Sequence, residues 1–392
     1  MAFNASTTRL TQLATHILES VAELEEKLSN QGFPSPTFNE DAPALLPKDT
    51  VQVRDSIIDA AAEVQDLLQG PLDIIFRHGS AISRFNIASL VPSGGQTTFA
   101  EIAKKTGLEE GTICRTLRHA MTMRVFREPE PGVVAHTQAS RALMDPVAND
   151  WMGCGTEEMW PASTRMVDAM EKWPGTQEPN ETAFALANGT EESIYQVLGA
   201  SPERAHRFAN CMKAYMGMQE YNASHVVNNY DWKSLGPVKI VDVGGGAGHV
   251  TMELAKAFPS LSIVVQDMEK MVEEANANIP ADLKDRFEFM VQDIFAPQTV
   301  QADVYFIRWV FHNWSDKYCA LILKALIPAL KPGARIIINE TCMPEPAFAS
   351  HERSLDEWKA LLAEVDPRFV FQTVKESIDS ALAVMEFIWT QD

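Results

Sequence analysis

The 392-residue sequence lacks three features that would assign it to a particular class of protein. No stretch approaches the roughly 18 consecutive apolar residues that a membrane-spanning helix needs. The five cysteines are scattered without CxxC spacing, and their odd number favours reduced thiols over a disulfide framework or a zinc site. No basic start followed by an apolar stretch opens the sequence, so we expect no secretory signal and a cytoplasmic location.

Basic residues are also in deficit, because 33 Lys and Arg stand against 53 Asp and Glu, for a formal net charge of −20. Such a charge repels phosphate backbones and anionic lipid surfaces, so we expect neither nucleic acid nor a membrane as a partner. No Asp-Asp-Asn grouping or His/carboxylate cluster indicates a metal site. What the sequence has is 46% hydrophobic residues, enough for two or three units that each bury a core.

The N-terminal residues predict a helix and a linker. Apolar residues recur at spacings of three and four from Leu10 to Leu28, as on one face of a helix. That stripe either folds back on its own domain or pairs with a second subunit, and both alternatives stay open. Four prolines between residues 33 and 48 then exclude a helix or a central strand and predict a linker. We therefore treat residues 1–50 as one segment, an N-terminal helix followed by a proline-rich linker.

Residues 97–137 have a winged-helix pattern: a capped helix, a turn at Gly107, a second helix and a strand-like passage. DNA binding has to be weighed here, because Arg115, Arg118 and His119 lie on the second helix. Residues 97–143 carry seven Lys and Arg against five Asp and Glu, too small a surplus to offset the overall charge. Packing or dimerisation is therefore favoured, and we assign residues 51–230 to a mainly helical dimerisation and substrate-lid region.

From residue 238 onward, strand-like and helical patterns alternate. We predict strands at 238–243, 261–266, 287–291, 304–309, 334–340, 369–374 and 381–389. The alternation predicts an α/β fold, a doubly wound, Rossmann-like and mainly parallel sheet of seven strands. The last two strands have no helix between them, so they predict a terminal antiparallel hairpin, and we place this domain at residues 231–392.

The first of these strands ends in a glycine-rich turn that runs from Gly244 to Gly248 and opens a helix. Glycines at this point let backbone amides approach a ligand at the carboxyl end of the first strand, where doubly wound sheets bind nucleosides. The dinucleotide fingerprint GxGxxG, started at Gly244, requires a glycine where the sequence has His249. The turn therefore favours a nucleoside without phosphates over NAD.

An acidic residue follows each of the next two strands. Asp267 lies 23 residues after Gly244, where a carboxylate can accept both ribose hydroxyls. Asp293 could accept from an adenine amino group, with Ile294 and Phe295 flanking the ring. An acid at a strand end is often only a helix cap, but three consecutive strand ends in this order favour a nucleoside site.

Several motifs resemble those of the fungal and plant small-molecule O-methyltransferases, a family that includes methyltransferase-like pericyclases: VDVGGGAGHV, VVQDM, VQDIF, RWVFHNWSDKYC and LKPGARIIINE. The resemblance covers nearly the whole chain, since family members also carry an N-terminal winged-helix domain that dimerises. It implies a homodimer and S-adenosylmethionine (SAM) as the cofactor. It also implies cofactor contacts at Gly244, Gly246, Asp267, Met268, Asp293, Ile294 and Arg308.

The resemblance further implies methyl transfer to a hydroxyl of a small aromatic or polyketide-type molecule. SAM carries an activated methyl group, so the enzyme mainly aligns the acceptor oxygen, the methyl carbon and the sulfur. A phenol with a pKa of about 10 needs a base, and a histidine, with a pKa of about 6.5, can take its proton. An isolated histidine is usually structural, but within HNWSD His312 matches the family's general base. Glu340 and Glu352 match the glutamates that flank that base.

The acceptor side of the site is less clearly marked. Phe208, Met212, Met216 and Trp309 are candidate substrate contacts, although Met and aromatic residues at helical spacing are usually core. Family members carry an additional helix, which lines the acceptor pocket, before the motif that begins at His351. Here the chain runs almost directly from Pro344 to His351, so we expect an open or remodelled pocket.

Two other functions remain as alternatives. One is a pericyclase or dehydratase that keeps SAM as an electrostatic cofactor without consuming it. His136 could join such a site, although beside a wing strand a structural histidine is favoured. The other is a catalytically idle partner subunit that binds SAM or only dimerises.

Overall fold

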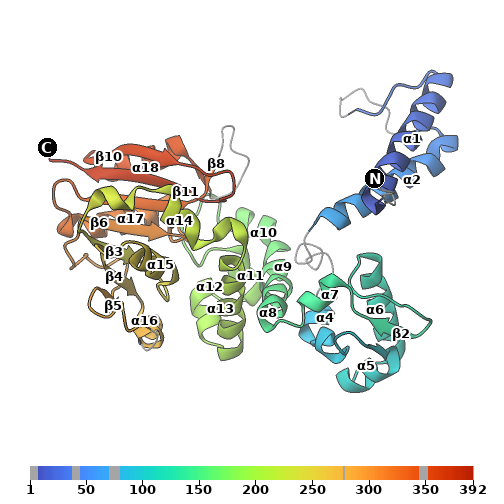
Figure 1. Cartoon of the computed structure of the whole chain (residues 1–392), viewed down its shortest axis with the longest axis horizontal. Helices are drawn as coiled ribbons and strands as arrows, with labels where there is room; N and C mark the ends of the chain where they lie inside the picture. Colours follow the sequence, from blue (N-terminus) through green and yellow to red (C-terminus); the bar gives the residue numbers. More distant parts are fainter. Residues whose placement is uncertain (1–7, 38–44, 70–79, 277–278, 344–351, 392) are drawn as a thin grey trace, which may run out of the picture. The chain divides into compact units, whose positions relative to one another are not determined.

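The computed structural model describes residues 8–37, 45–69, 80–276, 279–343 and 352–391. The chain divides into two compact units, Met1–Glu158 and Met159–Asp392, and each is described here by itself (Figure 1). The sequence predicted boundaries at residues 50 and 230, and the second of these lies inside the compact unit Met159–Asp392. Helices from Trp160 onward belong to the same unit as the sheet.

The first unit begins with a helical hairpin of α1 (Arg9–Asn30) and α2 (Val51–Leu68), with the short helix η1 (Lys48–Thr50) before α2. Leu24 and Leu28 of α1 are buried with Val53 of α2, so part of the predicted apolar stripe is covered within the unit. Leu10 and Val21 of that stripe keep 39% and 38% of their surface exposed, and Leu18, beside the stripe, keeps 72%. The hairpin therefore covers only part of the stripe.

The rest of the first unit forms a second small core. Its elements are α4 (Ser80–Arg84), η2 (Ile87–Leu90), β1 (Gln96–Thr98), α5 (Phe99–Thr106), α6 (Glu110–Thr122), β2 (Val133–Ala135), α7 (Gln138–Ala142) and α8 (Pro146–Cys154). A capping box of Thr98 and Glu101 starts α5, and Gly107, at a φ of 76°, ends it. β1 and β2 pair antiparallel beside the two helices, an arrangement consistent with the expected winged helix.

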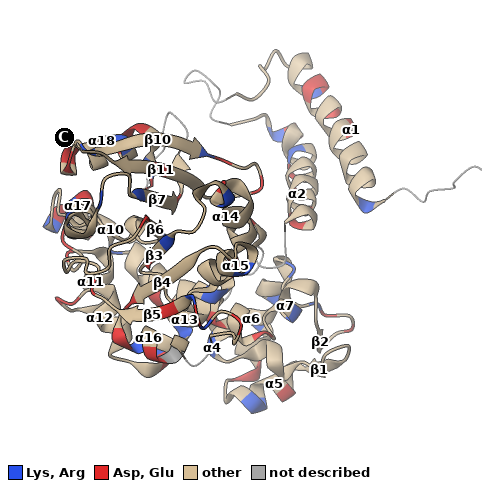
Figure 2. Ribbon diagram, turned by 60° about the vertical axis from the view of Figure 1, so that its left-hand side comes forward, with Lys and Arg blue, Asp and Glu red and all other residues tan. Residues whose placement is uncertain are grey.

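One basic side chain of α6 is paired with an acidic residue. Arg118 donates two hydrogen bonds, of 2.8 and 2.7 Å, to the carboxylate of Glu128. Figure 2 shows basic and acidic residues interspersed along the helices of this unit. These contacts support the packing interpretation of this region over DNA binding.

The second unit opens with short helices that lead into the sheet. They are α9 (Trp160–Ser163), α10 (Met166–Lys172), α11 (Ala183–Asn188), α12 (Ile194–Gly199), α13 (Pro202–Met216), η4 (Gln219–Tyr221), α14 (Ala223–Asn229) and η5 (Trp232–Leu235), after η3 (Gly155–Met159) at the unit boundary. Phe184 of α11 and Leu198 of α12 share a small apolar cluster with Phe208 of α13. The helices of this region thus have a core of their own.

A seven-stranded sheet forms the centre of the second unit, as the sequence predicted (Figure 1). The strand order is β10 (Phe369–Lys375), β11 (Ala383–Trp389), β7 (Arg335–Glu340), β6 (Val304–Arg308), β3 (Lys239–Val243), β4 (Ser262–Asp267) and β5 (Phe287–Val291). The five strands from β7 to β5 are parallel, and β11 is antiparallel to both neighbours. The order reverses between β6 and β3, which places the ligand crevice at their carboxyl ends.

Alternating side chains of the strands pack on both faces of this sheet. Tyr305 and Ile307 of β6 lie in one core with α17 (Asp316–Leu326) and α18 (Leu355–Val365). Val304 and Phe306 lie in the opposite core with α15 (His249–Ala257). The remaining elements are α16 (Glu269–Asn276), η6 (Phe311–Asn313), η7 (Ile327–Ala329) and the short pair β8 (Cys342–Met343) and β9 (Arg353–Ser354). Because both faces are covered, the carboxyl edge is where a ligand can reach the strands.

Within the described part of the chain, no helix is long and apolar enough to cross a membrane. The five cysteines are all free thiols, as their number and spacing predicted.

Candidate active site

The turn between β3 and α15 passes so close to its neighbours that only glycine fits. A Cβ on Gly245 would lie 2.7 Å from Cγ1 of Val265 and closer still to the carboxyl group of Asp242. Gly244 and Gly248 have φ angles of 70° and 69°, in the left-handed region that other residues rarely adopt. The glycines therefore let the main chain form a tight turn over the end of β3, where its amides can face a ligand.

Asp267, at the end of β4, is bonded to this turn. Its Oδ2 accepts a 2.8 Å hydrogen bond from the amide of Gly246, and its Oδ1 accepts one of 2.8 Å from the amide of Met268. A carboxylate oxygen has two lone pairs, so each oxygen can still accept from a ribose hydroxyl.

A second carboxyl group lies beneath the turn. Asp242 is buried, and burial raises its pKa to about 7, with the nearby charge of Asp267 adding to the effect. The hydroxyl of Thr251 donates a 2.7 Å hydrogen bond to Asp242 Oδ2 and opposes this shift. Protonation of Asp242 therefore falls close to neutral pH.

The carboxyl end of β5 combines an acid with an aromatic surface. Asp293 Oδ1 accepts a 2.9 Å hydrogen bond from the amide of Phe295, which turns the chain sharply after the strand. The ring of Phe295 meets the indole of Trp314 edge-on, with centroids 4.9 Å apart. Ile294 is half-buried against the sheet core. Trp314 belongs to the HNWSD motif, so its presence in the site had a signal in the sequence.

His312 and Glu340 form a dyad at the carboxyl ends of β6 and β7. Glu340 is fully buried, and its Oε1 accepts from the amides of Val310 and Phe311 at 2.8 and 2.9 Å. Its Oε2 lies 3.1 Å from Nδ1 of His312. A carboxylate can only accept, so Nδ1 carries the proton and Nε2 keeps its lone pair. The His312 side chain is 31% exposed, which leaves the ring accessible to a ligand.

Glu352, just before β9, belongs to the same electrostatic group. Burial raises its pKa above the usual range for a glutamate, the charge of His312 lowers it, and the charge of Glu340 raises it further. Glu352 therefore lies close enough to the dyad for its charge to act on the imidazole. The three residues that the family resemblance marked as catalytic come together here.

Arg308 and Trp309 join the dyad to the helical region. The Arg308 guanidinium donates to Oδ1 of Asn339 and, at 2.7 Å, to the carbonyl of Tyr221, and its burial lowers its pKa to about 10. Trp309 has a φ of 54°, and its ring lies 4.6 Å from that of Tyr221 and 6.2 Å from that of His312. The guanidinium predicted to contact the cofactor is thus bound to protein groups.

The sequence did not predict Tyr221 as a site residue, because it belongs to no motif and lies 87 residues before its partner Arg308. Its ring and that of Trp309 form a wall beside the dyad, and the ring of Tyr215 meets both of them edge-on. Burial raises the pKa of Tyr221, and the charges of Glu220 and Glu352 add to this. The aromatic wall is therefore close to Glu352 as well as to His312.

The other predicted substrate residues are not all at the dyad. Phe208 packs in the helical cluster, and Met212 and Met216 are exposed. His136 lies in the first unit, where Nε2 bonds the carbonyl of Val91 and Nδ1 bonds the hydroxyl of Ser140, both at 3.0 Å. With both ring nitrogens bonded, His136 has the contacts of a structural histidine. The shortened segment from Pro344 to His351 lies outside the described residues.

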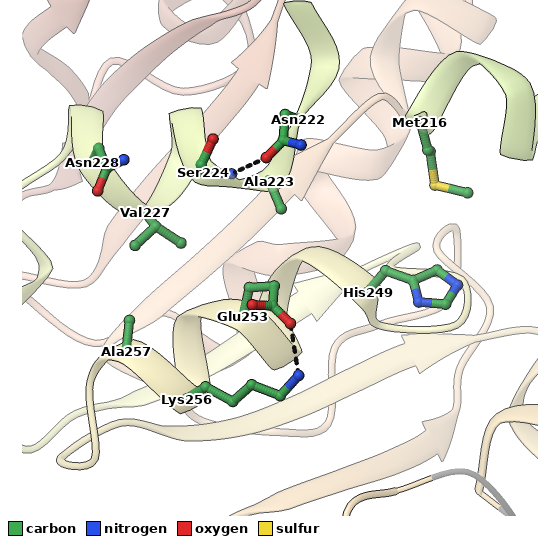
Figure 3. Close-up of a pocket in the computed structure, with 10 residues that line it drawn as sticks. All are labelled: Met216, Asn222, Ala223, Ser224, Val227, Asn228, His249, Glu253, Lys256 and Ala257. Atoms are coloured by element: carbon green, nitrogen blue, oxygen red, sulfur yellow. Dashed lines mark hydrogen bonds and ion pairs between the residues drawn. The ribbon is translucent and has the colours of Figure 1, made fainter. Parts of the chain in front are cut away.

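A cavity of about 740 Å³ lies between α14 and α15 (Figure 3). Met216 and His249 line one end of it, and Ala257 lies at the other. His249 directly follows the glycine turn, so this space adjoins the cofactor side of the site. Residues of the His312 dyad do not line it.

Among the residues with a described placement, no three His, Cys, Asp or Glu side chains are grouped as a metal ion would require. His312 and Glu340 contact each other directly.

The chain matches the family model for the O-methyltransferase domain over residues 172–364. It is 39% identical to O-methyltransferase PaMT of Phomopsis amygdali, over 98% of this chain and 97% of that one. It is 36% identical to O-methyltransferase AMT9 of Alternaria alternata, over 98% and 99% of the two chains. It is 33% identical to the chlorophenol O-methyltransferase of Trichoderma longibrachiatum, over 98% and 91%.

Solved structures share the fold at lower identity. LepI in complex with SAM matches with a TM-score of 0.65 and 21% identity, over 95% of this chain and all of that one. OxaC with S-adenosylhomocysteine and oxaline matches with a TM-score of 0.69 and 17% identity, over 96% of this chain and all of that one. The site's geometry and the near full-length sequence similarity agree, and the chain belongs to the family of SAM-dependent O-methyltransferases.

Proposed function

We propose that this chain transfers the methyl group of SAM to a hydroxyl of a small aromatic or polyketide-type molecule, with His312 as the general base. The observation that supports this most is the buried Glu340, which holds Nδ1 of a partly exposed His312 at 3.1 Å. A named relative, the chlorophenol O-methyltransferase, acts on a phenol, which is the kind of acceptor this dyad could deprotonate.

The carboxyl ends of β3, β4 and β5 would hold the cofactor. Gly244 and Gly246 would offer main-chain contacts, Asp267 and Met268 would meet the ribose, and Asp293 and Ile294 would meet the adenine. When bound, SAM supplies a methyl group that a positively charged sulfur has already activated. The residues of the chain therefore have to orient the acceptor and take its proton.

Nε2 of His312 accepts the proton of the acceptor hydroxyl as the oxygen gains the methyl group. The positive charge that forms on the imidazole is stabilised by the Glu340 carboxylate, whose orientation the amides of Val310 and Phe311 fix. Glu352 adds a second negative charge near the ring when it is ionised. Because His312 is partly exposed, it can return its proton to solvent after each turnover.

We place the acceptor against the wall of Trp309 and Tyr221, because flat aromatic molecules pack well on such rings. The alignment with PaMT extends over 417 positions, so that relative has at least 25 residues that this chain lacks. We propose that the short run from Pro344 to His351 leaves the acceptor side of the pocket more open.

We further propose that the protein is a homodimer that uses its N-terminal helices. Leu18 on α1, and Ile58 and Leu68 on α2, are exposed in the single chain, and a second copy could cover them. Light scattering of the purified protein would show the mass of a dimer. Leu18→Glu is expected to shift that mass toward the monomer without unfolding the second unit.

The proposed reaction is tested by incubating the protein with SAM labelled in the methyl group and a panel of phenols. Release of S-adenosylhomocysteine together with a labelled ether is the expected result. Conversion of an acceptor without S-adenosylhomocysteine would instead support the pericyclase alternative. If neither occurs, although SAM binds, the chain is an idle partner subunit.

A further inference from the structure

The segment between α10 and α11 lies against the start of α17, about 140 residues later in the chain. Ser315 is the N-cap residue of α17, but its side chain makes no capping bond. It instead donates a 2.9 Å hydrogen bond to the carbonyl of Gln177. The side-chain oxygen of Gln177 accepts from the amide of Lys317 at 2.8 Å, which is the bond that an N-cap side chain normally makes.

Glu178 adds two contacts to the same helix end. Its carboxylate forms an ion pair with Lys317 and accepts a 2.8 Å hydrogen bond from the hydroxyl of Tyr318. These hydrogen bonds, that of Lys317 first, lower the pKa of Glu178, so the pair is charged at neutral pH. We call these contacts of Gln177 and Glu178 with Ser315, Lys317 and Tyr318 the clasp.

An aromatic group lies directly beside the clasp. The indole of Trp314 is 4.9 Å from the ring of Phe295, 5.5 Å from that of Tyr318 and 6.4 Å from that of Tyr195. Tyr195 comes from α12, in the helical region, and also meets Phe208 edge-on at 6.3 Å. It is nevertheless 42% exposed, so much of its surface is free for another group.

Tyr195 thus contacts Trp314, which in turn contacts Phe295, and the clasp holds the segment between α10 and α11, one helix before the helix α12 that carries Tyr195. We propose that Tyr195 is a cofactor-contacting residue, the outer wall of the adenine pocket, and that the clasp is what positions this wall. A planar base has a face that aromatic rings of this kind can stack on. The inference rests on the proposed function, which places adenine at Asp293 and Ile294, next to Phe295.

The test compares binding of two ligands by Tyr195→Ala. S-adenosylhomocysteine is the complete cofactor after loss of its methyl group, whereas 5′-methylthioadenosine has the adenine and ribose but lacks the amino acid part. Calorimetry is expected to show that Tyr195→Ala weakens both by the same factor, roughly tenfold, and that Tyr195→Phe binds like the unmodified protein. Equal losses would locate the contact at the adenosine end.

The clasp is tested separately with Gln177→Ala/Glu178→Ala. Stopped-flow measurements are expected to show faster release of S-adenosylhomocysteine, several-fold, with little change in the association rate. Glu23→Ala, which breaks the exposed Glu23–Lys27 ion pair of α1, is the matched control and should release the ligand at the normal rate. Normal release by the clasp variant would refute its positioning role.

Circular dichroism melts distinguish a lost contact from a lost fold. Unchanged affinity of a folded Tyr195→Ala variant for both ligands would overturn the inference while leaving the proposed reaction intact. Failure of the unmodified protein to bind S-adenosylhomocysteine would overturn both.

Discussion

The two halves of the site are built in different ways. At the proposed cofactor half, the carboxylates of Asp267 and Asp293 accept hydrogen bonds from amides one and two residues further along the chain, and Asp267 also accepts one from Gly246, 21 residues earlier. At the proposed reaction half, Glu340 accepts from amides about 30 residues earlier, in the turn after β6, and Arg308 donates to a carbonyl 87 residues earlier. The proposed cofactor half is therefore held by contacts of shorter range than those of the proposed reaction half.

The sharpest test of this division is His312→Ala. Removing a general base is expected to lower kcat by about 10²- to 10⁴-fold. The affinity for SAM should change less than about twofold, because the cofactor half does not use the imidazole. Steady-state kinetics and calorimetry on the same preparation check both parts, and an unchanged kcat would remove His312 from the mechanism.

Asp242→Asn tests the cofactor half through stability. The pKa of Asp242 is raised from 3.8 to about 7 in the folded protein, so between these values the folded state holds a proton that the unfolded state has lost. The stability from this group is complete below pH 4 and is lost as the pH rises through 7. Asparagine does not titrate, so the variant does not lose this stability. Between pH 4 and pH 8, the free energy of unfolding of the unmodified protein should therefore fall relative to that of the variant by on the order of 4 kcal/mol.

Denaturant titrations at several pH values measure this difference. Thr251→Val removes the hydroxyl that lowers the pKa of Asp242, so this comparison variant should show a pH dependence at least as large as that of the unmodified protein. If the free energies of unfolding of Asp242→Asn and of the unmodified protein change in parallel with pH, burial does not raise the pKa of Asp242.

Asp267→Asn is expected to affect binding alone. The amide cannot accept at both positions, so one of the bonds to the turn or to the ribose is lost, and the Kd for SAM should rise about tenfold. At saturating SAM, kcat should stay within about twofold, since the dyad is untouched. A large drop in kcat with a normal Kd would contradict the separation of the two halves.

Glu352→Gln should have the smallest effect, a loss of several-fold in kcat that depends on pH. Burial raises the pKa of Glu352, so its charge is present only above this raised value. The ratio of unmodified to variant kcat should be largest at alkaline pH and shrink toward one as the pH falls. A ratio independent of pH would show that Glu352 acts by packing and not by its charge.

The sequence predicted the parts of the molecule that follow local patterns. The seven strands, the glycine turn and the acids after β4 and β5 repeat signals that a single segment carries. The contacts of Tyr221 with Arg308 and of Gln177 with α17 could not be predicted, because each joins segments 87 to 140 residues apart. Arg308 illustrates the limit, since the family resemblance implied a cofactor contact for it, whereas its bonds to Asn339 and Tyr221 had no signal in the sequence.

The way Glu340 is held has a consequence for how such an enzyme can diversify. Two of its three partners are main-chain amides, which every amino acid except proline provides. Substitutions in the aromatic wall of Trp309 and Tyr221 should therefore leave the Glu340–His312 contact in place. On the proposed mechanism, the choice of acceptor could then change without a change in the group that takes its proton.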